Sequence, residues 1–123
     1  MAFISKRLAD ARKIVLAYSA ATLIIDYPLR HKAVFRLSGT AVGFSREQLI
    51  EMISEKYHQI YTEEERTVTV KTLPASERAI MNRNETNGKY GIWGHDLSDL
   101  DLDDIDVYKQ SNGQIYLLLE LDS

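Results

Sequence analysis

The chain has 123 residues, ordinary proportions of apolar and charged side chains, and a formal net charge of −3. This length fits a single domain over residues 1–123, and the composition excludes intrinsically disordered and fibrous proteins. The absence of cysteine excludes disulfide frameworks, zinc–cysteine sites and thiol catalysis, and it favours a reducing compartment such as the cytoplasm.

The first predicted element is a helix over residues 3–20. Apolar side chains recur there every three or four positions, from Ile4 and Leu8 to Val15 and Tyr18, which is the spacing of a helical stripe. Basic residues precede the apolar run, as they do in a secretory signal. The run is too short to span a membrane. We therefore expect a helix of the mature fold, with an organelle transit sequence as the alternative.

A strand and a second long helix are predicted next. Residues 31–42 alternate in the manner of a strand. Ser45 followed by Gln48 is a capping-box pattern, and an apolar stripe over residues 49–61 predicts the helix behind it. Three glutamates, at 63–65, fall at the end of that helix, where the helix dipole disfavours negative charge. We expect a solvated helix end there, with an acidic patch for a basic partner as the alternative.

The next segments predict shorter elements. Residues 67–73 alternate polar and apolar positions and are rich in β-branched residues, which is typical of a strand. Pro74 can begin a short helix that ends at Met81. After residue 100, leucine and aspartate alternate, and the pattern changes phase at the pair 103–104. That change predicts a strand with a β-bulge.

The chain is predicted to finish with a β-hairpin. Asn112 and Gly113 form the pair that a two-residue type I′ turn prefers, and this turn would place Val107 opposite Leu118. Residues 115–119 are apolar on both faces, which indicates a central strand covered on both sides. Together the elements predict an α+β domain: a mostly antiparallel sheet of about four strands, packed by two long helices.

The segment 82–96 shows neither the helical nor the strand repeat of apolar residues, although it holds the only tryptophan and half of the glycines. Long structureless loops are usually functional or disordered, and the aromatic residues argue against disorder. Gly88, Gly91 and Gly94 do not match the dinucleotide fingerprint, because no helix follows them, and Tyr90 stands where a P-loop needs Ser or Thr. A backbone cradle for an anion is still compatible with these glycines.

Our leading hypothesis is a non-enzymatic protein-interaction module that uses the 82–96 loop together with the acidic C-terminal strands. Tyr, Trp and Arg anchor many protein interfaces, and the loop contains all three. The alternative is a small-molecule or anion-binding domain, conceivably a weak enzyme, with its pocket at the same loop. Both hypotheses use the same candidate binding residues: Arg83, Lys89, Tyr90, Trp93, His95 and Asp96.

No catalytic, metal or cofactor site is predicted. Adjacent residues such as His95 and Asp96 point apart in extended chain, so they do not by themselves form a catalytic pair. Asp99, Asp101 and Asp103 have the spacing of the first three EF-hand ligands, but Asp104 stands where that loop requires glycine. We expect a protein partner, with a homodimer as one form of it. The acidic balance argues against nucleic acid, and no membrane partner is expected.

Overall fold

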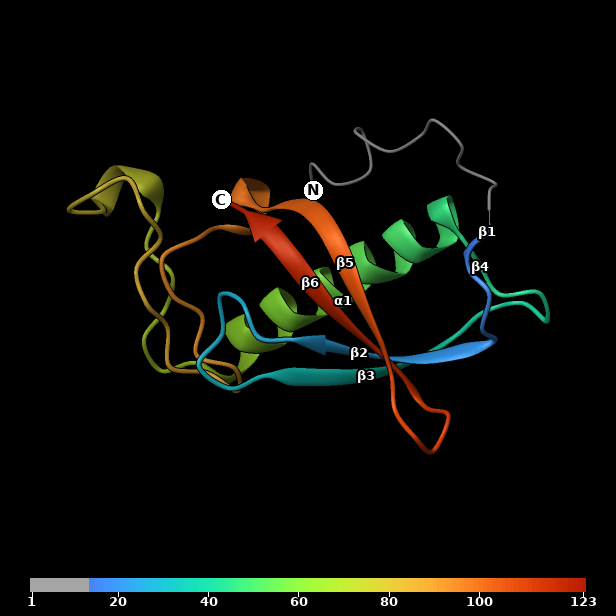
Figure 1. The fold of residues 1–123 in the computed structure, drawn as a ribbon. Coiled ribbons are helices and arrows are strands. Elements are labelled where there is room, and N and C mark those ends of the chain that lie inside the picture. The colour runs from blue at the N-terminus through green and yellow to red at the C-terminus, as the bar shows by residue number, and fades with distance from the viewer. Residues whose placement is uncertain (1–13) are drawn as a thin grey trace.

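The computed structural model describes residues 14–123. Figure 1 shows a strongly twisted sheet with one long helix, α1, packed along it. Two short 3-10 helices, η2 and η3, lie between α1 and the final hairpin. In chain order the elements are β1 (Ile14–Leu16), β2 (Ala20–Ile25), β3 (Ala33–Ser38), β4 (Phe44–Ser45), α1 (Arg46–Thr67), η2 (Ala75–Glu77), η3 (Leu97–Asp99), β5 (Asp101–Lys109) and β6 (Ile115–Asp122).

The main sheet has four strands in the order β3-β2-β6-β5. β2 pairs antiparallel with β3 and parallel with β6, and β6 pairs antiparallel with β5. The C-terminal strand β6 is therefore internal to the sheet, as its apolar character indicates. β1 and β4 form a separate two-stranded pair.

The core lies between α1 and one face of the main sheet. The helix begins as its sequence predicts, because the Ser45 hydroxyl accepts a hydrogen bond from the backbone N–H of Gln48 at 3.1 Å. Alternate residues of β2 are buried, as in a strand that covers a core with one face. The helix and β2 together bury Leu49, Ile50, Ile53, Tyr57, Ile60, Ala21, Leu23 and Ile25.

The α+β class is confirmed, but the prediction of two long helices is wrong within the described residues. The part of the predicted 3–20 helix that is described forms β1 and the start of β2; residues 3–13 lie outside the described range. Ile14 and Val15 are β-branched and favour strands. The prediction from apolar spacing did not take this preference into account. The prediction of about four strands is also incomplete, because the pair β1–β4 adds to the four-stranded sheet.

Residues 67–73 do not form the predicted strand. Their backbone is paired with asparagine side chains instead of a neighbouring strand. The Asn87 side-chain oxygen accepts from the N–H groups of Thr69 and Val70, and the Asn84 oxygen accepts from the N–H of Leu73. These bonds satisfy an extended segment without a sheet, since asparagine mimics backbone groups. The predicted 74–81 helix is reduced to η2.

The C-terminal hairpin and the bulge are confirmed, but the pairing is shifted by one residue. Val107 lies opposite Leu117 rather than Leu118. The loop contains three residues, 111–113, because Gln110 N–H donates to the Gln114 carbonyl at 2.9 Å, and Gly113 takes a φ of 87°. This is the longer hairpin turn that ends in a glycine bulge. No helix among the described residues is both long and apolar enough to cross a membrane.

Candidate functional site

The 82–96 loop is organised around the carboxylate of Glu64, which is fully buried at the C-terminal end of α1. Oε2 accepts from the Thr86 hydroxyl at 2.6 Å and from the backbone N–H of Gly88 at 2.8 Å. Oε1 accepts from the N–H groups of Tyr90 at 2.9 Å and Gly91 at 3.2 Å. The loop therefore forms a cradle of N–H groups, and the anion it holds is a side chain of the same protein.

Glycine is required where the loop passes over this carboxylate. A Cβ on Gly88 would lie 2.6 Å from Glu64 Oε1 and 2.7 Å from the Glu64 backbone oxygen. Gly91 has a φ of 64°, in the left-handed region that side chains disfavour. Gly88 thus allows the backbone to approach Glu64 closely, and Gly91 allows the left-handed turn that follows.

The cradle keeps Glu64 ionised although it is buried. Burial raises its pKa, but the hydrogen bonds from Thr86 and from the N–H groups of Tyr90, Gly88 and Ile92 outweigh burial and lower the pKa below its ordinary value. A buried carboxylate without these donors would lose its charge or destabilise the fold. The sequence predicted that the glutamates at 63–65 form a solvated helix end or, alternatively, an acidic patch for a basic partner. Glu64 does neither, because its carboxylate is buried inside the loop.

Arg83 is also buried, with 4% of its surface exposed. Its Nη1 donates to the Thr86 hydroxyl and to two backbone carbonyls at 3.2 Å, and its Nη2 donates to Thr72 Oγ1 at 2.8 Å. Nη2 also lies 3.4 Å from Glu65 Oε1, and the guanidinium is 5.5 Å from the Tyr61 ring centroid. Its donors are therefore directed at groups within the fold.

Trp93 is the more accessible of the two aromatic candidates, with 36% of its surface exposed. It packs edge-to-face on Tyr27, with ring centroids 5.2 Å apart, and its centroid lies 5.8 Å from that of His95. The Tyr27 hydroxyl is 2.8 Å from His95 Nε2 and 2.9 Å from the Ser123 hydroxyl. These side chains form a half-exposed aromatic cluster beside the C-terminal end of β6.

The remaining candidates point elsewhere. Lys89 pairs with Glu63 at 2.9 Å on the surface of α1. Tyr90 is buried, and its hydroxyl donates to the same Glu63 carboxylate at 3.3 Å. Asp96 accepts two hydrogen bonds from Arg78, at 2.7 and 3.1 Å. The structure therefore brings the side chains of Trp93 and His95 together, brings those of Lys89 and Tyr90 together at Glu63, and directs Asp96 to Arg78.

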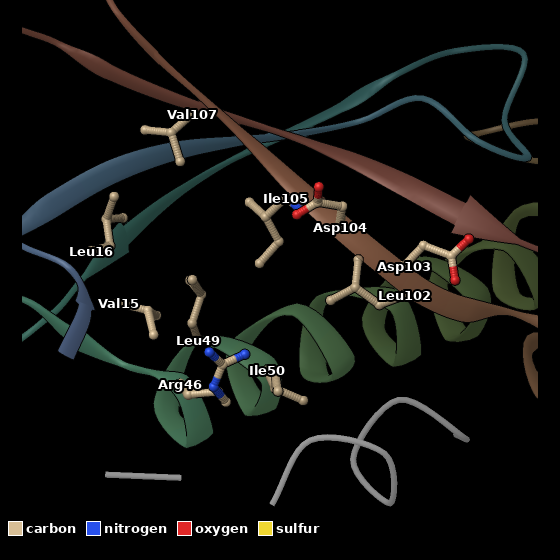
Figure 2. Close-up of a pocket in the computed structure, with 10 residues that line it drawn as sticks. All are labelled: Val15, Leu16, Arg46, Leu49, Ile50, Leu102, Asp103, Asp104, Ile105 and Val107. Atoms are coloured by element: carbon tan, nitrogen blue, oxygen red, sulfur yellow. The ribbon is translucent and has the colours of Figure 1, made fainter. Parts of the chain in front are cut away.

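Two cavities have linings that include none of the six candidates. The first, of about 250 Å³, lies between α1 and β5 (Figure 2), where Arg46, Leu49 and Ile50 face Leu102 and Ile105. The second, of about 370 Å³, lies at the 82–96 loop itself, and its lining is Arg30, His31, Val70, Glu85, Thr86, Asn87, Gly88 and Gly91. Neither cavity is lined by Arg83, Lys89, Tyr90, Trp93, His95 or Asp96.

One group of acidic side chains could offer ligands to a metal ion. Oxygens of Asp104, Asp106 and Glu120 lie within 4.8 Å of one another on β5 and β6. A hydrogen bond with Asp106 and the Asp106 charge raise the pKa of Glu120. Acidic side chains at a protein surface often lie together without an ion, and EF-hand geometry is absent because Asp101 and Asp103 lie in β5.

Comparison with protein-family models, with curated proteins and with solved structures gave no match to this chain. The residues that hold the site together, Glu64 and Thr86, were not among the sequence candidates. The signal that could have indicated Glu64 is the unfavourable position of three glutamates at a helix end, followed by a glycine-rich loop with many free N–H donors.

Proposed function

We propose that the protein is a non-enzymatic protein-interaction module, and that its binding surface is on the arm formed by residues 68–96. Figure 1 shows the part of the arm around η2 extending away from the sheet and from α1. The observation that carries the proposal is a set of exposed apolar side chains on this part. Leu73, Ile80 and Met81, which we call the apolar tip, are 40%, 69% and 93% exposed.

The apolar tip is held in place by hydrogen bonds, as a preformed binding surface requires. Arg78 donates to the carbonyl oxygens of Leu73 at 2.9 Å and Met81 at 3.4 Å, and it also pairs with Asp96. Closer to α1, the buried groups of Arg83 and Glu64 fix the base of the arm. A rigid surface loses less conformational entropy when a partner binds.

The composition of the tip and its surroundings suits a protein partner. Exposed clusters of large apolar side chains mark interaction sites, and methionine and tryptophan are enriched at interfaces. Trp93, at the base of the arm, is a further accessible apolar side chain. The acidic C-terminal strands are a further expected contact. We expect a partner protein in the cytoplasm, with a second copy of the chain as one form of partner, rather than nucleic acid or a membrane.

The alternative of a small-molecule or anion pocket has a cavity at the same loop, but none of the four polar residues that it names lines that cavity. Its four polar residues, Arg83, Lys89, His95 and Asp96, bind different neighbours rather than facing one cavity. The N–H groups that could bind an anion are occupied by Glu64. The interaction module is therefore the hypothesis that we carry forward.

The proposal is tested by comparing partners of the full-length protein with those of an Ile80→Ser/Met81→Ser variant, each purified with a tag from its native cells. The matched control is Val42→Ser, because Val42 is also exposed, at 68%, but lies in the turn before β4. We expect the tip variant to lose a specific partner that the control and the wild type retain. Equal recovery of every bound protein by all three would contradict the proposal.

A further inference from the structure

The chain contains two Asn-Gly pairs, and the structure places them in different environments. Asn87-Gly88 lies in the 82–96 loop, and Asn112-Gly113 lies in the turn between β5 and β6. An asparagine that is followed by glycine readily loses its side-chain ammonia, because glycine has no Cβ to shield its backbone nitrogen. The surroundings of each pair therefore decide whether this reaction takes place in the folded protein.

The reaction is a cyclisation followed by hydrolysis. The backbone nitrogen of the glycine gives up its proton and attacks Cγ of the asparagine. The new bond between nitrogen and Cγ replaces the bond from Cγ to Nδ2, and Nδ2 leaves with the proton as ammonia. Water, the only other reactant, then opens the cyclic imide at either carbonyl carbon, which yields aspartate or isoaspartate. The glycine nitrogen must therefore reach Cγ and carry a transient negative charge.

Asn87-Gly88 meets neither requirement while the loop is folded. The Asn87 Oδ1 accepts from the N–H groups of Thr69 and Val70, at 3.1 and 2.9 Å, and Nδ2 donates to the Thr69 hydroxyl at 2.7 Å. These bonds hold the side chain in place. The Gly88 N–H donates to the ionised Glu64 carboxylate at 2.8 Å, so a negative charge on this nitrogen would lie beside a second negative charge.

Asn112-Gly113 is less restrained. Both residues are exposed, and the space that a side chain on Gly113 would occupy is open. The Asn112 Oδ1 accepts from the N–H of Gln114 at 3.0 Å, and its Nδ2 has no partner among the described residues. The Gly113 N–H donates to the Gln110 carbonyl at 2.9 Å. That acceptor is neutral, and the bond lies in an exposed turn, where local opening costs little free energy.

We propose that Asn112 is a site of spontaneous conversion to aspartate and isoaspartate in the folded protein, and that the contacts of Asn87-Gly88 with Glu64 and Thr69 protect Asn87 from the same reaction. The conversion adds a negative charge to the end of the hairpin. In isoaspartate the backbone also runs through the former side chain, which lengthens the turn between β5 and β6 by a methylene group. Figure 1 shows this turn away from the arm that carries the apolar tip, so the two proposals can fail independently.

Incubation of the full chain at neutral pH, followed by proteolysis and mass spectrometry, tests the proposal. The change in mass from amide to acid is read separately in the fragments that contain Asn87 and Asn112. Synthetic peptides that span each pair are incubated in parallel and give the rate without a fold. Relative to its own peptide, Asn112 should react at least roughly tenfold faster than Asn87, because the loop must open before Asn87 can cyclise. Equal relative rates, or a faster reaction at Asn87, would overturn the proposal.

Two variants, each shown to be folded by circular dichroism, test whether Glu64 supplies the protection. Glu64→Ala removes the acceptor of the Gly88 N–H, whereas Leu117→Ala lowers the stability of the whole fold from the core side of β6. Asn87 should react at least roughly tenfold faster in Glu64→Ala than in the wild type, and much less so in Leu117→Ala. Equal increases in the two variants, or no increase in Glu64→Ala, would overturn the assignment of the protection to Glu64.

Discussion

The Glu64 carboxylate accepts a hydrogen bond from the backbone N–H of Gly88 at 2.8 Å, across 24 positions of sequence. This contact joins the last turn of α1 to the glycine-rich loop at a point where a side chain on residue 88 would not fit. The loop that carries the candidate residues is thus built on one buried charge. The predictions below test that relationship first and the surfaces that depend on it afterwards.

Replacing Glu64 should destabilise the protein strongly. Glu64→Ala removes the acceptor of several buried N–H groups and of the Thr86 hydroxyl, and each donor left without a partner carries a desolvation cost. We expect a loss of about 3 kcal/mol or more in the free energy of unfolding. Urea denaturation followed by circular dichroism measures it. Glu55→Ala, at an exposed position of the same helix, is the matched control and should change stability by less than about 0.5 kcal/mol.

Gly88→Ala should destabilise the protein more than Gly94→Ala. Gly88→Ala forces a Cβ against the Glu64 carboxylate and backbone, at a cost of about 1–3 kcal/mol. Gly94 has a φ of 69° and open space around it, so Gly94→Ala tests backbone strain alone, at about 1 kcal/mol. Thermal unfolding of the two variants gives the comparison. Equal losses would show that the close approach at Gly88 contributes nothing.

Acid should remove the contribution of Glu64. Its pKa is lowered in the folded protein from an ordinary value of 4.5, so the ionised form favours folding. The contribution is complete above pH 4.5 and is lost as the pH falls through the lower, folded-state value. The stability difference between wild type and Glu64→Gln should therefore be largest near neutral pH and shrink below pH 4.5. A difference that is constant down to the acid transition would contradict a lowered pKa.

Replacing Arg83 with lysine should destabilise the protein. The two Arg83 nitrogens that donate reach acceptors on different sides, including Thr72 and the Ile92 carbonyl, and an ammonium group cannot reproduce that fork. We expect Arg83→Lys to cost about 2 kcal/mol or more, since buried acceptors lose their donors. Arg30→Lys is the control, because Arg30 is exposed and pairs with Glu85 on the surface. Chemical denaturation of both variants measures the two changes in the free energy of unfolding, and equal changes would contradict this role of Arg83.

The apolar tip should be dispensable for folding. Ile80 and Met81 are largely exposed, so Ile80→Ser/Met81→Ser should change the free energy of unfolding by less than about 0.5 kcal/mol. A melting curve that overlays the wild type would confirm this, and it would allow any loss of partner to be assigned to the surface. A marked loss of stability would instead place these side chains in the fold.

Local patterns in the sequence predicted the elements that depend on local chemistry. The Ser45 cap and the bulge after Leu102 each follow from a few neighbouring residues, and both are present. The turn at Gly113 is also present, but its loop has three residues instead of two and the pairing is shifted by one. The prediction of a helix over 3–20 is wrong for the part that is described. The apolar spacing that includes Val15 and Tyr18 is compatible with an extended backbone as well as with a helix. Strand pairing with distant β6 and β4 decides between them, and no local pattern contains that information.

The 82–96 loop also depends on contacts between distant residues, which local sequence patterns do not reveal. Sequence correctly indicated that residues 82–96 form no regular element, but it gave no sign that Asn84 and Asn87 replace a strand partner for residues 69–73. Glu64 was obscured for a related reason, since its donors lie more than 20 positions away. Whether Trp93 and His95 bind a partner stays a prediction.

Backbone amide hydrogen exchange tests most directly whether Glu64 holds the loop. In the wild type we expect the N–H groups of Gly88, Tyr90 and Gly91 to be protected, although they lie outside any helix or strand. In Glu64→Ala these amides should exchange much faster, while the β2 amide of Leu23 keeps the protection that the remaining global stability allows. Equal exchange of the loop amides in the two proteins would show that the loop is held by something other than Glu64.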